Sequence, residues 1–510
     1  MKKNIAYAFI TLLFFVLRTW ATEVPASSSA IAEEILRHVR YLASEELTGR
    51  GVDTPGIDKA RDYIAREFTK YGLVPLDKTA TYLQGLNVVT GVKVKEPTTL
   101  TLGNGLPLAL HQEWVPLALS RSGIVKGEVV FVGYGITTKD HGYDDYAGVD
   151  VKGKIALVLR YEPPPKGEKS PFRKPPGFSP HATLRTKATN ARNHGASAMI
   201  LVDLGPPRAG EKDLIPIARS LGRGETGLVA VQVKRGIVEK WLQEEGVSLP
   251  ELKEKIDREE KPASLPLPRL KPSVHVILEQ ITTKTDNVIG ILPGSDPRLK
   301  EEMIVVGAHY DHIGLGYVGG RDPSTEGQIH NGADDNASGT AVLLTLAQRL
   351  GPLPERPPRT VVFAAFTGEE LGLYGSRHFV THPPFPITSA KAMVNLDMVG
   401  RMTDNRVTVS GTDSAKEFRG LVTEAGQKLG VEIKPSTGRI GSSDHAPFYE
   451  KNIPVLHVYT GSHDDYHRPT DDWEKLNIEG MVKITDVVLS VIEKIASAKE
   501  PPTFNSSPRP

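Results

Sequence analysis

Five apolar runs in the second half of the chain constrain its fold more than any other feature of the sequence. They are NVIGIL, EEMIVVGAHY, RTVVFAAF, AKAMVNLDMV and KNIPVLHVY. Segments with helical periodicity, such as SGTAVLLTLAQRL and KEFRGLVTEAGQKLG, lie between them. Strands that alternate with helices predict a mostly parallel sheet covered on both faces. We therefore expect an α/β fold in which helices sandwich a mixed, mostly parallel sheet.

The first part of the chain contributes two more helices. The segment IAEEILRHVRYLASEELTGRGVDTPGIDKARDYIAREFTKYGL contains two amphipathic patterns that flank a Gly-rich turn. In the first pattern Ile35, Val39 and Leu42 share one face. Such a face predicts a helix that packs on an apolar core.

The character of the sequence changes between these two regions. From about residue 110, short β-type runs such as VKGKIALVLRY and SAMILVDL are broken by Gly and Pro. One helix-like segment, TLRTKATNARNHGA, ends at a glycine before a strand. The segment EEKPASLPLPRLKPS has the composition of a linker. We expect a separate, β-rich domain inserted at residues 115–272.

This insertion predicts a main domain in two parts. The expected boundaries are a signal peptide at 1–21, the main domain at 28–114 and 273–497, the inserted domain at 115–272 and a disordered tail at 498–510. The tail prediction rests on the polar, Pro-rich ending KEPPTFNSSPRP.

The first residues have the plan of a secretory signal peptide. Lys2 and Lys3 precede an apolar run from Ile5 to Leu17, and small residues follow around Ala21. A membrane anchor is the alternative, but this run is too short to span a bilayer comfortably. No other stretch approaches about 18 consecutive apolar residues. We therefore expect a secreted or periplasmic protein with no membrane contact after signal cleavage.

Charge and composition argue against several classes of function. A net charge of +1 over 510 residues argues against a nucleic-acid partner or an anionic membrane. The absence of cysteine excludes disulfides, thiol catalysis, iron–sulfur clusters and thiolate zinc sites. A serine hydrolase finds no support, because the sequence has no G-x-S-x-G elbow.

Polar residues of one chemical kind follow the predicted strands. They are His309 with Asp311, Glu369 with Glu370, Asp397, and His467. A fifth group, Asp334 with Asp335, precedes a helix that begins near Ala337. Because the carboxyl ends of parallel strands open into one crevice, we expect these side chains to lie together. Two imidazoles and several carboxylates, with no thiol, suit zinc, or more loosely manganese or cobalt.

Each of these residues taken alone also has a structural explanation. Asp335 is equally consistent with a helix N-cap, and a lone histidine beside a strand is more often packed or exposed than a ligand. Together, however, carboxylates gathered at one sheet edge repel one another unless a cation lies among them. The adjacent Glu369 and Glu370 then have two roles: one binds metal while the other takes a proton from metal-bound water.

These residues resemble a known family, the secreted di-zinc aminopeptidases, which are bacterial leucyl-aminopeptidase-like enzymes. Relatives of that family include glutamate carboxypeptidases, glutaminyl cyclases and the transferrin receptor ectodomain. The motifs that carry the resemblance are, in order, GAHYDHIG, GADDNASGTA, TGEELGLYGS, NLDMVGR and DYHRPTDD. The resemblance covers roughly residues 30–110 and 273–495. The inserted segment, with GYGI followed by GYDDYAGVDVKGKIALVLR, resembles a protease-associated domain.

The resemblance implies two zinc ions per chain, with Co²⁺ or Mn²⁺ as substitutes. Asp335 would bridge the two ions. His309 and Asp397 would complete one site, and Glu370 and His467 would complete the other. The substrates it implies are peptides, which would lose their N-terminal residues.

Further roles follow from the same resemblance. Glu369 would be the general base that activates a water bridging the zinc ions and later protonates the leaving amine. Tyr466 would stabilise the tetrahedral oxyanion through its hydroxyl. Asp311, two residues after His309, would be the carboxylate that orients this imidazole. The family usually has a cis peptide at the position of Asp335–Asn336.

Three alternatives stay open at this point. A glutamate-releasing carboxypeptidase would need basic residues near the metals, and Arg401, Arg439 and Arg468 are available. A glutaminyl cyclase works with one zinc, whereas this chain has ligands for two. A binding protein on an inactive peptidase scaffold would have lost ligands that this chain keeps.

Other polar residues near the motifs are expected to support the site. The segment GSSDHAP at 441–447 resembles a family segment that lines the cleft. Supporting or structural roles are expected for the remaining histidines, which are His312, His330, His445, His457 and His463.

Overall fold

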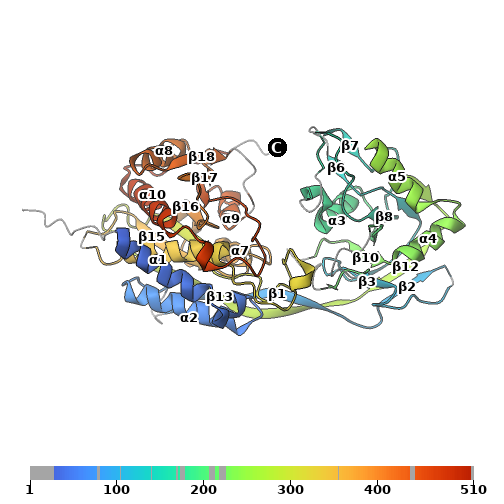
Figure 1. Cartoon of the computed structure of the whole chain (residues 1–510), viewed down its shortest axis with the longest axis horizontal. Helices are drawn as coiled ribbons and strands as arrows, with labels where there is room; N and C mark the ends of the chain where they lie inside the picture. The colour runs from blue at the N-terminus through green and yellow to red at the C-terminus, as the bar shows by residue number, and fades with distance from the viewer. Residues whose placement is uncertain are drawn as a thin grey trace, which may run out of the picture.

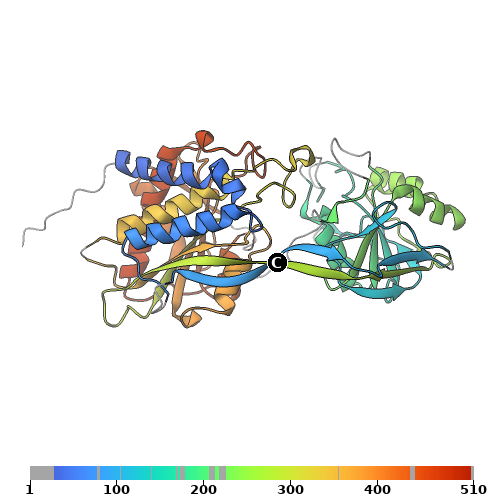
Figure 2. The same cartoon turned by 90° about the horizontal axis from the view of Figure 1, so that it is seen from below.

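The computed structural model describes residues 28–506, apart from gaps at 77–80, 104, 139–140, 168–169, 173–177, 206–212, 218–224, 354, 437–440 and 442. The predicted signal peptide at 1–21 lies outside the described residues. The chain forms two lobes joined by a long ribbon of two strands, β1 (Leu83–Val94) and β13 (Leu278–Leu292) (Figure 1 and Figure 2). None of the described helices is long and apolar enough to cross a membrane.

The first lobe is built on an eight-stranded sheet with the order β1-β13-β15-β14-β16-β19-β17-β18. Its other strands are β14 (Met303–His309), β15 (Thr360–Phe366), β16 (Ala390–Leu396), β17 (Arg406–Ser410), β18 (Glu432–Ser436) and β19 (Val455–Tyr459). The central strands β15, β14, β16 and β19 run parallel to one another. β13 pairs antiparallel with β1 and β15, and β17 pairs antiparallel with β19 but parallel with β18. The predicted α/β fold with a mixed sheet is confirmed.

Helices cover both faces of this sheet. One face carries α1 (Ser28–Leu42), α2 (Pro55–Lys70), α6 (Gly339–Leu350), α8 (Phe418–Lys428) and α10 (Ile478–Ser497). The other face carries α7 (Tyr374–Thr381) and α9 (His445–Glu450). Because the central strands are buried on both faces, they are continuously apolar rather than alternating. The predicted apolar face of α1 is fully buried against this core.

The second lobe has its own sheets and its own core. A six-stranded sheet has the order β11-β5-β8-β9-β10-β3, and a three-stranded sheet has the order β2-β12-β4. The strands are β2 (Thr99–Leu102), β3 (Trp114–Pro116), β4 (Gly123–Lys126), β5 (Val129–Phe131), β6 (Thr137–Thr138), β7 (Tyr143–Asp144), β8 (Ile155–Leu159), β9 (Ala198–Val202), β10 (Val229–Val233), β11 (Leu265–Leu267) and β12 (Pro272–Val276). The helices are α3 (Leu184–Asn193), α4 (Arg235–Glu244) and α5 (Leu249–Glu259).

Short helical turns connect these elements. The 3₁₀ turns are η1 (Glu45–Arg50), η3 (Pro180–Ala182), η5 (Pro323–Thr325), η7 (Ile387–Ser389) and η8 (Trp473–Lys475). A π-type turn, η6 (Ala333–Ser338), leads directly into α6.

Strand pairing extends the second lobe beyond the predicted limits of 115–272. It begins with β2 and ends with β12, which pair with each other. The segment EEKPASLPLPRLKPS is therefore not a linker, because it contains β11 and the start of β12. Proline misled the sequence interpretation here. Pro266 is tolerated in β11 because this strand lies at the edge of its sheet.

The C-terminal residues also differ from the prediction of a disordered tail at 498–510. From Thr503 to Asn505 the chain contacts the first lobe. The backbone N–H of Asn505 donates to the carbonyl of Ser414 at 2.8 Å, and the rings of Phe504 and Tyr449 lie 5.5 Å apart. The backbone N–H of Thr503 also donates to Glu417 at 3.0 Å, and the side chain of Asn505 donates to the carbonyl of Asp413 at 3.1 Å, so several contacts hold this polar ending in place.

Candidate metal centre

A cluster of metal-binding side chains lies at the carboxyl ends of the central parallel strands. In an open α/β sheet this edge forms the ligand crevice, because loops diverge there. The five predicted ligands all lie in it: His309 at the end of β14, Asp335 in η6, Glu370 after β15, Asp397 after β16 and His467 in the loop after β19.

Asp335 joins two groups of donor atoms. Its Oδ1 lies 3.3 Å from Nε2 of His309. The same nitrogen lies 3.3 Å from Oδ1 of Asp397. The Oδ2 of Asp335 lies 3.1 Å from Nε2 of His467. This nitrogen lies 3.1 Å from Oε2 of Glu370. The ligand atoms of each group lie within 4.8 Å of one another. One carboxylate therefore faces two adjacent sites with its two oxygens.

Backbone carbonyls aim both imidazoles at these carboxylates. Nδ1–H of His309 donates to the carbonyl of Asp311 at 3.1 Å, and Nδ1–H of His467 donates to that of Gly319 at 2.8 Å. Each Nε2 then faces two carboxylate oxygens. In their neutral form, both imidazoles would present the Nε2 lone pair to an ion held between them and these carboxylates. Imidazole and carboxylate donors of this kind fit zinc.

Charges within the cluster shift the pKa values of its members. Burial would lower the pKa of His467, but Glu370 and Asp335 raise it well above its usual range. Burial would raise the pKa of Glu370, but His467 and a hydrogen bond with His312 lower it to about 2. Positive imidazoles and negative carboxylates stabilise each other. A bound cation would replace the imidazole protons as the positive charge in the site.

Glu369 lies beside the cluster without joining it. Its carboxylate lines the cavity over the ligands, which measures about 210 Å³. The carboxylate of Glu369 makes no hydrogen bond or ion pair with any residue that the structure describes. Burial raises the pKa of Glu369 well above its usual range, Glu370 adds to this effect, and His309 opposes it. A carboxylate in this position can take up a proton and return it.

Asp311 is placed differently from the predicted role. The carbonyl of Asp311, and not its carboxylate, is the group nearest to Nδ1 of His309, since Oδ1 lies 3.8 Å away. The carboxylate instead accepts the backbone N–H groups of Glu369 at 3.1 Å and Glu370 at 3.4 Å. Asp311 thus fixes the turn after β15 as well as the imidazole, because its backbone and its side chain act on different partners.

Tyr466, which the resemblance assigns to the oxyanion, lines the same cavity. Its ring stacks on His467 with a centroid distance of 3.9 Å. The guanidinium of Arg321 lies 4.5 Å from the centroid of the Tyr466 ring. Burial, followed by the charges of Asp335 and Glu370, raises the pKa of the Tyr466 hydroxyl well above its usual range. This hydroxyl therefore remains a hydrogen-bond donor.

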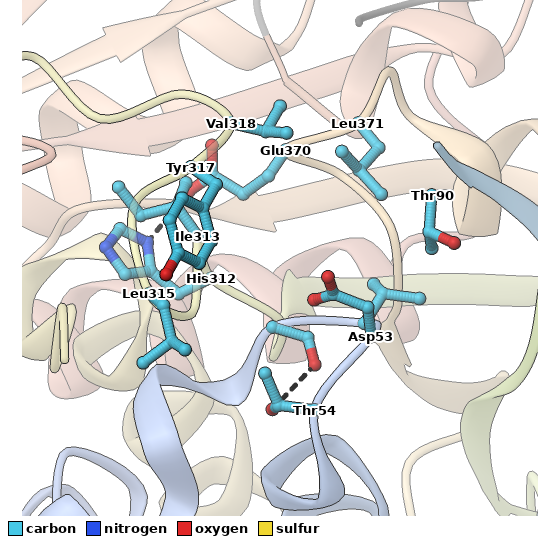
Figure 3. Close-up of a pocket in the computed structure, with 12 residues that line it drawn as sticks. Asp53, Thr54, Thr90, His312, Ile313, Leu315, Tyr317, Val318, Glu370 and Leu371 are labelled. Carbon is cyan, nitrogen blue, oxygen red and sulfur yellow. Dashed lines mark hydrogen bonds and ion pairs between the residues drawn. The ribbon is translucent and has the colours of Figure 1, made fainter. Parts of the chain in front are cut away.

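His312 contacts the cluster more closely than a supporting role in the surrounding fold would require. Its Nδ1 lies 2.8 Å from Oε1 of Glu370, as the dashed line in Figure 3 shows, and 3.9 Å from Oδ2 of Asp335. Its side chain is fully buried. The sequence contains a second histidine three residues after His309, in HYDH, and this spacing was the feature that could have indicated a contact of His312 with the site.

Asp471 holds the turn that carries Asp335, and sequence interpretation did not single it out. Its Oδ2 accepts the backbone N–H groups of Asp334 at 2.9 Å and Asp335 at 3.1 Å. Arg401 donates to the other oxygen of Asp471 at 3.1 Å. The peptide bond Asp335–Asn336 is cis, as the resemblance implies.

The remaining histidines of the motifs lie outside the two ligand groups. His445 and His457 are buried and stack on each other with a centroid distance of 4.4 Å. Nε2 of His463 lies 3.1 Å from Oδ2 of Asp334. Nδ1–H of His330 donates to a backbone carbonyl, that of Gln328. Asp444, in the segment 441–447, is fully buried, and its charge is among those that raise the pKa of Glu369 after burial.

Two family models match separate parts of the chain. Residues 287–492 match peptidase family M28, and residues 125–240 match the PA domain. The first match contains the five ligand positions, and the second lies within the inserted lobe.

Individual proteins show the same similarity. The chain is 28% identical over 375 residues to aminopeptidase YwaD of Bacillus subtilis, and the match covers 71% of this chain and 67% of that protein. It is 28% identical over 191 residues to leupeptin-inactivating enzyme 1 of Streptomyces exfoliatus, covering 37% of this chain and 38% of that enzyme. The solved aminopeptidase of Aneurinibacillus sp. strain AM-1 shares the fold, with a TM-score of 0.57, 22% identity and coverage of 93% and 96%.

Proposed function

Because this chain is a metallopeptidase of family M28 with an inserted PA domain, we propose that it is an exported zinc aminopeptidase that releases N-terminal residues from peptides. One observation carries the proposal. Asp335 faces two separate donor groups with its two carboxylate oxygens, and an unengaged glutamate, Glu369, lies beside both. The names of the relatives YwaD and the Aneurinibacillus enzyme agree with aminopeptidase activity.

The donor groups define where two zinc ions would be held. His309, Asp335 and Asp397 would hold one ion, and Asp335, Glu370 and His467 would hold the other. Bound zinc would polarise the substrate carbonyl and lower the pKa of water in the cavity. The protein fixes its ligands in advance, since backbone carbonyls orient the imidazoles of His309 and His467.

Glu369 and Tyr466 supply the groups that act on the substrate. The free carboxylate of Glu369 accepts a proton from the attacking water and later gives it to the leaving amine. The Tyr466 hydroxyl, which keeps its proton, donates a hydrogen bond to the oxyanion that develops on the carbonyl oxygen. The hydrogen bonds from Glu369 and Glu370 to Asp311 keep the base and its neighbour at fixed positions.

The arginines that a carboxypeptidase could use are mostly engaged by other residues. Two of the three arginines that a carboxypeptidase could use are paired: Arg401 with Asp465 and Asp471, and Arg468 with Asp322. The third, Arg439, lies outside the described residues. Neither Arg401 nor Arg468 is therefore free to bind the terminal carboxylate of a substrate.

The test uses peptides with free or acetylated N-termini. The protein is treated with chelator, divided, and half of it is restored with zinc before digestion, and products are read by mass spectrometry. We expect zinc-dependent loss of residues from free N-termini only. Trimming of acetylated peptides from the other end would instead establish a carboxypeptidase, with Arg321 as the residue to examine for carboxylate binding. Failure to cleave either series would remove the proposed function.

The export part of the proposal rests on the sequence of residues 1–21. N-terminal sequencing of the protein recovered from the medium or periplasm should show a start after Ala21 or Ala26. A cytoplasmic protein that retains Lys2 and Lys3 would contradict export.

A further inference from the structure

A second cavity adjoins the metal centre. It measures about 140 Å³ and lies between the loop at 51–54, strand β1 and the loop that follows β14 (Figure 3). Glu370 lines both this cavity and the cavity over the ligands. A cavity of about 150 Å³ can hold a benzene molecule, so this one has room for a single large amino-acid side chain. A side chain beside the scissile bond could therefore enter it.

The walls of this cavity are mostly apolar. The apolar and aromatic lining residues are Val52, Ile313, Leu315, Tyr317, Val318 and Leu371. Polar groups come from Asp53, Thr54, Thr90, His312 and Glu370. Among the lining residues that the structure describes there is no lysine or arginine. The lining thus combines an aliphatic surface with an excess of negative charge.

Asp53 is the acidic group of this lining that has no partner. Its carboxylate makes no hydrogen bond or ion pair within the described part of the chain, and its side chain is exposed. Figure 3 shows this carboxylate directed toward the enclosed space. Glu370, in contrast, is engaged by His312 and His467. An unpaired carboxylate at the end of apolar walls is complementary to a cation carried on an aliphatic stem.

We propose that this cavity binds a side chain of the substrate next to the scissile bond, that it favours lysine and arginine, and that Asp53 contacts their cationic end. The proposal rests on the aminopeptidase function proposed above. The methylene stem would lie against Ile313 and Leu315, while the ammonium or guanidinium group reaches Asp53 at the open side of the cavity. An acidic side chain would be repelled by the unpaired carboxylate of Asp53.

The first experiment compares peptides on the zinc-loaded protein. Two series are used, one that varies the first residue and one that varies the second, with lysine, arginine, norleucine, alanine and glutamate at the varied position. Norleucine has the lysine stem without the charge. In one series we expect kcat/KM for lysine to exceed that for norleucine on the order of fivefold, the effect of one partly exposed ion pair. This ratio should fall as salt rises. Equal values for lysine and norleucine in both series would overturn the proposal.

Substitutions at Asp53 test the assigned contact. Asp53→Asn should bring lysine peptides down to the norleucine level and leave alanine and norleucine peptides unchanged, while Asp53→Lys should favour glutamate. Glu33→Gln, at an exposed carboxylate of α1, is the matched control and should change no ratio. If Asp53→Asn slowed every peptide equally, Asp53 would be holding the α-ammonium group or the fold, and the proposal would be wrong.

Filling the cavity gives an independent test. Thr90 lines it from β1, so Thr90→Phe should lower kcat/KM for lysine and norleucine peptides while alanine peptides remain good substrates. The alanine value also shows that this variant folds. Unchanged lysine and norleucine values would overturn the placement of the side chain. A wild-type protein that cleaves peptides without preferring lysine or arginine contradicts only this inference, whereas one that cleaves no free N-terminus contradicts the proposed function as well.

Discussion

At the scale of single residues, two neighbouring carboxylates are given different properties by what surrounds them. Glu370 contacts two imidazoles, and its pKa is lowered to about 2 although burial opposes this shift. Glu369 has no such contact, and burial raises its pKa. The pair therefore divides into a permanent anion, suited to hold a cation, and a group that exchanges a proton.

Glu369→Gln should keep both zinc ions and lower kcat by about 10²–10⁴-fold, the usual contribution of a general base. Glu370→Ala should lose one zinc ion, because it removes a ligand. Elemental analysis of the purified variants, together with kcat, separates the two. Loss of metal from Glu369→Gln would mean that the two assignments are exchanged.

His312→Ala should weaken zinc binding by about 10- to 100-fold, because Nδ1 would no longer fix Oε1 of Glu370. Competition with a chelator gives the affinities of the two ions. His312→Asn, which can still donate a hydrogen bond, should recover part of the loss, and His330→Ala is a control near the same loop. Affinities equal to the wild type would show that this contact does not position Glu370.

Four of the five predicted ligands, all except Asp335, follow apolar runs that end at one edge of the sheet, and the full set was implied by the resemblance to the di-zinc aminopeptidases. The structure brings the five side chains together. The sequence did not predict the contacts of His312 and Asp471. Those contacts depend on how separate loops meet: His312 and Glu370 are 58 positions apart, and Asp471 and Asp335 are 136 apart. No local periodicity carries that information.

At the scale of elements, α1 and α2 are joined by a charged network as well as by their apolar faces. Arg37 of α1 lies 2.5 Å from Glu34 and 2.7 Å from Glu67 of α2. Its guanidinium also donates to the Tyr63 hydroxyl at 2.8 Å. Hydrogen bonds with His38, then with Arg37, lower the pKa of Glu34 although burial opposes them. For Glu67, burial would raise the pKa, but the bond with Arg37 lowers it.

Arg37→Met should lower the free energy of unfolding at pH 7 by about 1 kcal/mol, since Arg37 is partly exposed. A carboxylate whose pKa is lower in the folded state stabilises the fold above its ordinary pKa, and this contribution is lost as pH falls toward the lower folded value. The difference from wild type should therefore shrink below about pH 4. Urea unfolding of both proteins from pH 7 to below about pH 4, with chelator present throughout, measures this difference in the free energy of unfolding.

Arg66→Met on the exposed side of α2 is the matched control and should show little change at any pH. A destabilisation by Arg37→Met that stayed constant between pH 7 and pH 3 would show that the stem of Arg37, and not its charge, stabilises the pair.

Elements with strong periodicity were predictable, and those that depend on a partner strand were not. The central strands and the helices of the first lobe follow the apolar patterns in their own residues. By contrast, β2 and β12 are short and pair across 170 intervening residues or so, and Pro266 disguises β11. The ordered tail depends on the ring of Phe504 and on hydrogen bonds of Thr503 and Asn505 to the first lobe, which composition alone does not reveal.

At the scale of the whole molecule, the two lobes are independent in their cores. The apolar clusters of the first lobe share no residue with those of the second. The connection is the antiparallel ribbon of β1 and β13, in which Val94 pairs directly with Leu278. The inserted lobe thus occupies the end of a hairpin.

A variant in which Asn-Gly joins Val94 directly to Leu278 should fold and keep the metal centre, because two residues close an antiparallel hairpin. We expect the zinc content and the hydrolysis of short free-amine peptides to remain, since no predicted ligand lies in the deleted lobe. Elemental analysis and a peptide assay check this. A variant that is folded by circular dichroism but has lost zinc would show that the second lobe supports the metal centre.

The ribbon has a consequence beyond linkage. Its register shifts between Val89 and Gly91, so that Thr90 is left without a partner in the ladder and lines the second cavity. The ribbon that carries the inserted lobe therefore also forms part of the wall of the second cavity, which Glu370 lines as well. Binding of a partner to the inserted lobe would bend the ribbon of β1 and β13 and so change the shape of the second cavity. Such bending would change the substrate selectivity. Because the chain has no cysteine, two cysteines introduced across β1 and β13 could form a disulfide that fixes the ribbon. If the ratio of kcat/KM for lysine and norleucine peptides did not change on oxidation, the ribbon would not affect selectivity.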